Sequence, residues 1–215
     1  MTMHSGERPR EERRSAHKGS AILEAATTVF LNNGYLGTSM DEIAALARVS
    51  KQTVYKHFAG KERLFIEIVT KMVNEISDPI YHEVLSIVES GDIEADLRDL
   101  ARRLLHAVVQ PRLLQLRRLV IGEANRFPTL GRTFYECGPG RTMGALAAVF
   151  ERLSVRDVLH LDDSALAAAH FNWLIMSAPL NEAMLLGTDE LPAPVDLERH
   201  IDSAIRVFLA AYRNN

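Results

Sequence analysis

Cysteine is almost missing from this sequence of 215 residues: Cys137 is its single thiol, which excludes an internal disulfide framework. A composition of this kind fits the reducing cytosol. Long uncharged apolar runs are missing too, so no membrane-spanning helix and no membrane partner are expected. The first residues are polar and charged and show no apolar core, so no secretory signal is expected. Together these absences favour a cytoplasmic location.

Strand-like alternation of apolar and polar residues is also missing, and apolar residues instead recur at helical spacing along the chain. We therefore expect an all-α fold. Asp78-Pro79 should interrupt one helix, and Gly138-Pro139-Gly140 should form a turn. Helices are expected over about 15–33, 61–77, 97–108, 113–127, 141–153, 165–186 and 197–212, besides the short pair described below.

Positive charge gathers at one end of the chain. The formal net charge is −3, but residues 1–61 hold nine Lys/Arg against six Asp/Glu, whereas the remainder holds 16 against 22. A basic head on an acidic body is expected when only one end meets phosphate. Residues 1–14 have no periodicity and should form a flexible arm. Its arginines (Arg8, Arg10, Arg13 and Arg14) form either a solvated tail or an arm that follows DNA.

The segment from Thr38 to Phe58 reads as two short helices joined by a tight turn. Ser39 and Glu42 have the spacing of a capping box, and Ser50 is placed to cap the second helix. Polar and charged side chains fill that second helix, from which they could reach base edges and phosphates in a major groove. The pattern predicts a helix-turn-helix. A pair of amphipathic helices whose polar faces only meet water is the alternative.

With its flanks, the run AILEAATTVFLNNGYLGTSMDEIAALARVSKQTVYKHFAGKERLF resembles the DNA-binding domain of the TetR family of bacterial transcriptional regulators. The segments RRLVIGEANRFPTLGRTFYECGPGR and DDSALAAAHFNWLIMSAPLNEAML are similar to AefR-like regulatory domains. One departure is visible, since Arg48 stands where the family usually has glycine. If that position needs a positive φ, arginine costs about 1 kcal/mol relative to glycine.

The resemblance implies a TetR-like organisation: an arm over 1–14, a helix-turn-helix DNA-binding domain over 15–61, and a regulatory ligand-binding and dimerisation domain over 62–215. It implies a repressor that binds a near-palindromic double-stranded DNA operator and is released by a small, largely apolar effector, with no cofactor. It also implies a homodimer through the last two helices, whose wide apolar coverage fits a partner chain. Two internal core helices are the alternative there. A ligand-independent DNA-binding or scaffold protein of the same fold is the alternative function.

The expected DNA contacts divide into two sets. Lys51, Gln52 and Thr53 should face base edges, with Ser39 and Ser50 at the two helix starts. Phosphates should be held by side chains that set the register without reading sequence. These are Thr38, Tyr55, Lys56, His57 and Lys61.

Polar residues on otherwise apolar stripes are candidates for a ligand pocket, because a mostly apolar cavity with a few polar groups is typical of small-ligand sites. These candidates are Arg117, Glu123, His170, Asn172 and Trp173. An intramolecular arrangement of Arg117 with Glu123, or contacts at an interface, is the alternative. The histidines are scattered and Cys137 lacks catalytic or metal-binding neighbours, so neither an enzyme nor a metal site is expected. A redox-sensing role for Cys137 stays open.

Overall fold

The computed structural model describes residues 8–87, 91–186 and 193–214, and these form helices joined by short connections. The all-α prediction is confirmed: within these ranges the extended pairing is limited to one isolated bridge between Leu159 and Arg213. The helices are α1 (Arg8–Gly37), α2 (Met40–Leu46), α3 (Lys51–His57), α4 (Lys61–Ser86), α5 (Ile93–Val108), α6 (Pro111–Glu123), α7 (Pro128–Cys137), α8 (Pro139–Val155), α9 (Ser164–Leu186) and α10 (Pro194–Tyr212).

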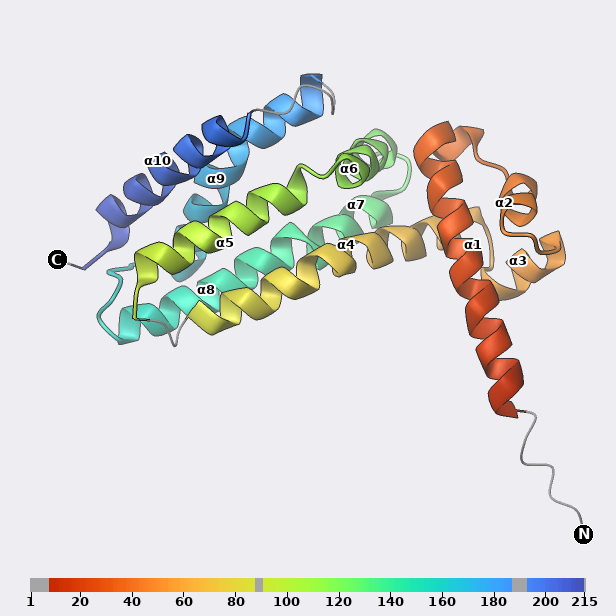
Figure 1. The fold of residues 1–215 in the computed structure, drawn as a ribbon, viewed down its shortest axis with the longest axis horizontal. Helices are drawn as coiled ribbons and strands as arrows, with labels where there is room; N and C mark the ends of the chain where they lie inside the picture. Colours follow the sequence, from red (N-terminus) through yellow and green to blue (C-terminus); the bar gives the residue numbers. More distant parts are fainter. Residues whose placement is uncertain (1–7, 88–90, 187–192, 215) are drawn as a thin grey trace, which may run out of the picture.

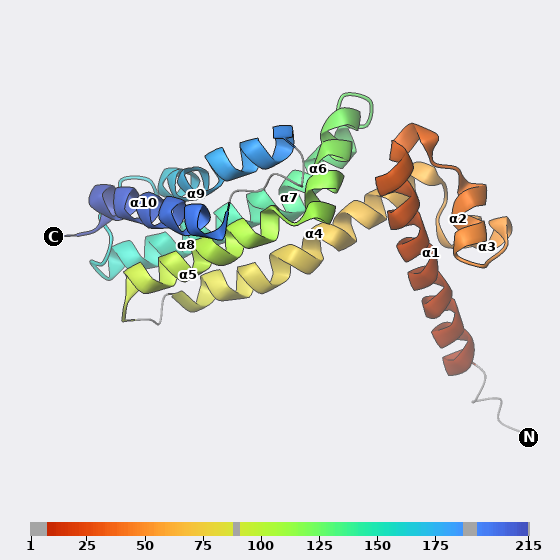
Figure 2. The same cartoon turned by 45° about the horizontal axis from the view of Figure 1, so that its top comes forward.

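The molecule has a small head and an elongated helical body, as Figures 1 and 2 show from two sides. Helices α1 to α3 form the head, and α4 runs from it along the body. One cluster of buried residues fills the body between α4, α5, α8, α9 and α10. A second cluster fills the head but also includes Leu113, Leu116 and Val120 of α6, with Leu130 and Phe134 of α7. Helices α6 and α7 therefore pack against the head, although they follow the expected boundary at residue 61.

Helix α1 begins at Arg8, seven residues before the expected start, so the expected arm is helical from that point. Proline is tolerated in a first helical turn, where its missing N–H would have no partner, and the arginines and glutamates after Pro9 are good helix formers. The beginning of α1 projects past α3 into open space (Figure 1). Gly34 has φ 70° and ψ 177°, which interrupts the helix at the predicted place.

Two predicted breaks were placed wrongly. Helix α4 passes through Pro79 to Ser86, because Ile80 and Val84 bury their side chains in the body cluster and continue the apolar stripe. The expected turn around Pro139 is shorter than predicted, since Pro139 occupies the first turn of α8. Asp163 caps the start of α9, because it accepts hydrogen bonds from the backbone N–H groups of Ala165 and Leu166. Gly187, a residue type suited to closing a helix, lies outside the described residues.

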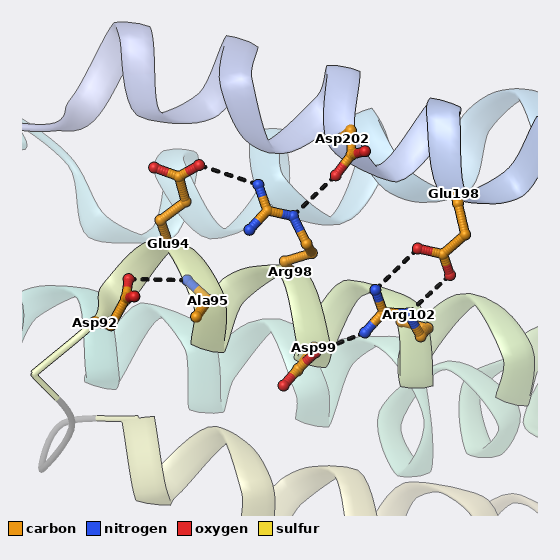
Figure 3. Close-up of polar contacts among 8 residues, drawn as sticks. All are labelled: Asp92, Glu94, Ala95, Arg98, Asp99, Arg102, Glu198 and Asp202. Atoms are coloured by element: carbon orange, nitrogen blue, oxygen red, sulfur yellow. Dashed lines mark hydrogen bonds and ion pairs between the residues drawn. The ribbon is translucent and has the colours of Figure 1, made fainter.

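Helix α10 is fastened to α5 by paired charges (Figure 3). Arg98 Nε lies 2.8 Å from Asp202 Oδ1, and Arg102 donates to both carboxylate oxygens of Glu198 at 2.7 and 2.9 Å. Hydrogen bonding to Arg102 lowers the pKa of Glu198. Exposed pairs of this kind contribute only up to about 1 kcal/mol each, so they fix the position of α10 more than they stabilise the fold.

Helices α9 and α10 each have one face in the body cluster and apolar side chains on the opposite face. Phe171, Ile175 and Phe208 are fully buried, whereas Leu166, Trp173 and Val207 are each 51% exposed. They are therefore core helices that also present apolar side chains at the surface, and pairing with a partner chain stays a prediction. Within the described ranges, every helix is too short or too polar to cross a lipid bilayer.

Candidate nucleic-acid interface and ligand cavity

Side-chain caps set the start of both short head helices. Ser39 accepts a hydrogen bond from the backbone N–H of Glu42 at 3.1 Å, and Ser50 accepts one from Thr53 at 3.1 Å. The Glu42 carboxylate does not complete the predicted capping box, because it accepts both its hydrogen bonds from Asn33 Nδ2 at 3.0 Å. It ties α2 to the end of α1 instead. Ser39 and Ser50 thus orient the two helices through their caps.

The turn between α2 and α3 is a Schellman motif. The N–H of Val49 bonds to the carbonyl of Ala44 at 3.0 Å, and the N–H of Arg48 bonds to that of Ala45 at 3.1 Å. Arg48 occupies the left-handed position that this motif requires, with φ 54°. The requirement for a positive φ at Arg48 is therefore confirmed.

Helix α3 presents a polar outer face. Val54 is fully buried in the head cluster and fixes the rotation of the helix, which leaves Lys51, Gln52, Tyr55 and Lys56 exposed. The Lys51 ammonium lies 2.9 Å from Asp41 on α2 in an exposed ion pair, whose hydrogen bond raises the pKa of Lys51. Breaking such an exposed ion pair costs little free energy, so Lys51 stays available to a DNA base or phosphate.

Other expected DNA contacts lie closer to the protein interior. Thr53 is half-buried and its hydroxyl lies 2.8 Å from that of Ser50. His57 is also half-buried, at the contact between α3 and Gly19 of α1. A long side chain is better able to reach a base from this face, which favours Lys51 and Gln52 over Thr53.

Thr38 and Lys61 differ from their expected role as phosphate contacts. Thr38 is 4% exposed, and its hydroxyl donates to the carbonyl of Gly34 at 2.7 Å. The Lys61 ammonium donates to the carbonyls of Thr38 at 2.6 Å and Leu36 at 3.3 Å, and burial lowers its pKa. The Thr38 side chain is therefore closed to phosphate, and Lys61 has one donor left for it. Both residues instead fasten the segment between α1 and α2.

A cavity of about 280 Å³ lies where the head cluster meets the body cluster. Val73, Val120 and Phe134 line it from the head cluster, and Leu104 and Met176 line it from the body cluster. Most of its wall is apolar. Its polar contributors are Ser77, Arg117, Tyr135, Thr142, Asn172 and the indole of Trp173.

The structure brings three of the five pocket candidates to this cavity, namely Arg117, Asn172 and Trp173. Glu123 and His170 are not part of the wall. Glu123 is the last residue of α6 and acts on the head: burial raises the pKa of Tyr35 there, and the charges of Glu62 and Glu123 add to this rise. His170 is exposed on α9, and its Nδ1 lies 2.5 Å from the Tyr212 hydroxyl. All five candidates lie on the expected helices, but the side chains of Glu123 and His170 are on faces that do not meet the cavity.

Arg117 has no carboxylate partner among the described residues. Its Nε is buried without a hydrogen bond, and its guanidinium lies over the Phe134 ring with Cζ 5.1 Å from the ring centroid. Burial lowers the pKa of this guanidinium, and the alternative arrangement, a pairing of Arg117 with Glu123, is not found among the described residues. A cation in an apolar wall without a counter-charge is costly, so an anion would be favoured beside it.

Aromatic contacts connect the α6–α7 corner to the head. The Phe127 ring lies 4.6 Å from that of Tyr35, which in turn lies 5.5 Å from Phe65. The Lys61 ammonium lies 4.6 Å from the centroid of the Tyr35 ring. A movement of α6 would therefore act directly on the head. Tyr35 and Phe127 are far apart in sequence and belong to no common periodic stripe, so no local pattern predicts this contact.

Two further contacts, of Thr142 and Arg118, were not predicted from the sequence. Thr142 lines the cavity from the start of α8, in the segment 141–153 that was expected to be helical but offered no candidate for the pocket. Arg118 donates to the carbonyls of Ala183 at 2.5 Å and Met184 at 3.1 Å, which caps the end of α9. Basic residues are favourable near helix C-termini, but here the residue comes from another helix, which no local pattern could indicate.

Two family descriptions match this chain. Residues 22–68 match the bacterial regulatory proteins of the tetR family, and residues 95–214 match the C-terminal domain of AefR-like transcriptional repressors. A curated HTH-type transcriptional repressor of Mycobacterium tuberculosis is 26% identical over 191 residues, which cover 86% of this chain and 88% of the relative. An HTH-type regulator of Bacillus subtilis is 47% identical over 62 residues, 29% of this chain and about a third (32%) of the relative's own length.

Solved structures agree over nearly the whole chain. A protein from Mesorhizobium loti, described as a TetR-family transcriptional regulator, is 42% identical with a TM-score of 0.87, covering 93% of this chain and 98% of that one. A flavonoid-responsive regulator is 32% identical with a TM-score of 0.72, covering 92% and 98%. The head and the body thus have the same arrangement in these proteins.

Proposed function

The chain belongs to the TetR family of bacterial transcriptional regulators, which are not enzymes, and we propose that it is a repressor released from a near-palindromic operator by a small, largely apolar ligand. Regulators of this family bind DNA, dimerise and respond to small molecules. The observation that carries the proposal is the combination, in one rigidly packed chain, of an outward polar face on α3 and a cavity against the head. Regulators of this family act on bacterial DNA, so we propose the cytoplasm as the site of action.

The DNA contacts of α3 divide according to reach and exposure. Gln52 is fully outside the head core and carries the amide that pairs bidentately with adenine in a major groove. Lys51 lies beside it, whereas Tyr55 and Lys56 lie one turn further along the same face. We assign Gln52 and Lys51 to base edges, and Tyr55 and Lys56 to phosphates. Arg48, exposed in the turn before α3, is a further phosphate contact.

The homodimer forms through the outer faces of α9 and α10. Leu166, Trp173 and Leu185 are 51%, 51% and 75% exposed along α9, and Val207 is 51% exposed on the neighbouring α10. Contiguous apolar surface on neighbouring helices is typical of protein interfaces. Two heads related by a two-fold axis address half-sites spaced by whole turns of about 34 Å.

The cavity supports a ligand-responsive regulator over a ligand-independent DNA-binding or scaffold protein. A scaffold gains nothing from a void, which leaves its lining atoms without contacts. The flavonoid-responsive regulator with a similar structure supports an aromatic effector for this chain as well. The ligand acts through α4, α6 and α7, which line the cavity and pack on the head.

Selection of bound sequences from random DNA, repeated with and without ligand, tests the proposal. On a selected operator, Gln52→Ala should lose about 1–3 kcal/mol, or roughly 5- to 150-fold in affinity, but little on scrambled DNA. The matched control is Lys56→Ala, on the same exposed face, which should weaken both DNAs alike and flatten the salt dependence. Equal losses of Gln52→Ala on both DNAs would contradict the assignment to bases. A strictly monomeric protein, or one that enriches no sequence, would contradict the repressor.

A further inference from the structure

The cavity contains three polar side chains that the protein leaves without partners, on three different helices. Besides the buried Nε of Arg117 on α6, Thr142 on α8 and Asn172 on α9 are only 6% and 5% exposed. Neither the Thr142 hydroxyl nor the Asn172 amide makes a hydrogen bond within the ranges that the structure describes. Buried polar atoms are nearly always hydrogen-bonded, so the unpaired Nε of Arg117 indicates a missing partner, to which the Thr142 and Asn172 side chains of the same wall could also donate.

The charge of the cavity wall indicates the charge of the missing ligand group. Arg117 is the one ionised side chain among the cavity-lining residues in the described part of the chain, and no aspartate or glutamate lines the cavity. An unpaired guanidinium away from water is costly, and a carboxylate that binds it in a bidentate manner removes the cost. All three side chains can donate hydrogen bonds, and a carboxylate accepts about four.

The size and the remaining wall define the body of the ligand. A cavity of about 150 Å³ accommodates benzene, so the volume of about 280 Å³ fits a flat group of two rings. The guanidinium of Arg117 lies over the face of the Phe134 ring. Tyr135, Trp173 and Ile121 stand at the open side, where they are 54%, 51% and 61% exposed. Aromatic rings on the wall favour an aromatic ligand through offset and edge-to-face contacts.

We propose that the effector is an aromatic carboxylate whose anionic group pairs with Arg117. Thr142 and Asn172 donate further hydrogen bonds to that group, and the aromatic rings of the ligand lie between α6, α7 and α9. This inference rests on the proposed function for its biological meaning, because it names the ligand class of that same cavity. It goes further in assigning the anion to a residue that lies in an otherwise apolar wall.

Isothermal titration of the full-length protein with 2-naphthoate and with 2-naphthamide tests the inference, because the two probes have the same shape and differ in charge. The carboxylate should bind about 10- to 100-fold more tightly than the amide. Arg117→Met keeps a long side chain over Phe134 but removes the charge, so it should abolish this preference. Arg112→Gln, at an exposed arginine of the same helix, is the matched control and should keep it.

Circular dichroism and thermal unfolding check that each variant folds. If Arg117→Met does not fold, Arg117→Lys should still fold and should retain the preference for the carboxylate with a lower affinity. Equal binding of the two probes to the wild-type protein, or an unchanged preference in Arg117→Met, would overturn the inference while the repressor proposal stands. If 2-naphthoate binds through Arg117 but does not change operator affinity, the carboxylate site stands and ligand-controlled release fails.

Discussion

Replacing Arg48 by glycine should relieve the backbone strain of a positive φ, although it removes a charged residue and adds no contact. Arg48 has φ 54° because the Schellman motif between α2 and α3 places its left-handed residue there. A side chain with a Cβ costs about 1–2 kcal/mol in this conformation. Glycine removes this cost, but it also makes the unfolded chain more flexible, which lowers the stability of the folded protein by about 0.4–1 kcal/mol. The net backbone gain should be about 0.5–1 kcal/mol, and the loss of the Arg48 charge at the C-terminus of α2 offsets part or all of it in the comparison with the wild-type protein.

The comparison with alanine isolates the backbone effect. Both Arg48→Gly and Arg48→Ala remove the favourable interaction of a cation with the C-terminus of α2, worth about 0.3–1 kcal/mol, but only glycine relieves the positive φ. Urea unfolding at one fixed protein concentration should therefore find Arg48→Gly more stable than Arg48→Ala by about 0.5–1 kcal/mol. In a chain of this length that difference corresponds to roughly 1–4 °C in Tm.

The same pair of variants separates stability from DNA binding. If the exposed Arg48 contacts a phosphate, both variants should weaken operator binding equally and lower the salt slope by about one unit. Equal stability of the glycine and alanine variants would refute the claim that the backbone at residue 48 is strained. It would mean that the turn relaxes to another conformation when the arginine is removed.

Three further outcomes follow from other contacts. Thr38→Val should destabilise the head by about 1 kcal/mol in chemical unfolding, because the buried hydroxyl loses its hydrogen bond to Gly34, but should leave the salt slope of DNA binding unchanged. The double variant Arg13→Ala/Arg14→Ala should lower the salt slope by up to about two units if α1 lies along the DNA backbone, as its exposed arginines suggest. Phe127→Ala should still bind both operator and ligand, but a gel shift with saturating ligand should find release reduced, because the ring contact with the head is lost.

Local patterns were sufficient for most of the head. The caps at Ser39 and Ser50, the break at Gly34 and the positive φ at Arg48 each depend on a few neighbouring residues, and all four match the structure. The helical periodicity of the body was equally readable. Such features are local because hydrogen bonds within one turn determine them.

The errors come from contacts between residues distant in sequence. Pro79 was expected to end α4, but burial of the following apolar residues in the body cluster outweighs the lost hydrogen bond. Lys61 stays a predicted phosphate contact, but the carbonyls of Leu36 and Thr38 accept two hydrogen bonds from its ammonium, which the sequence did not indicate. Glu123 and His170 lie on the expected helices, but neighbouring helices decide which face meets the cavity. Periodicity shows which residues share one face of a helix, but only the packing of the helices determines what that face contacts.

Different parts of the cavity wall should determine how tightly a ligand binds and how completely it releases the DNA. Moving a repressor from about 99% to 1% in the DNA-binding arrangement requires a ligand that prefers the other arrangement by about 10⁴-fold. Arg117 can pair with a carboxylate in both arrangements, so it contributes to binding without contributing fully to this preference. The preference must arise where the wall changes shape when the head moves, at α4, α6 and α7 beside Phe127 and Tyr35.

Two variants should therefore fail in opposite ways. Arg117→Met should need much more carboxylate but should release the operator fully once the ligand saturates the cavity. Phe127→Ala should bind the ligand with normal affinity but release incompletely at any concentration. Titrating a preformed operator complex with 2-naphthoate distinguishes a shift of the midpoint from a loss of amplitude. If both variants shifted only the midpoint, the contact between Phe127 and Tyr35 would not transmit the signal, and the head would have to be moved through α4 alone.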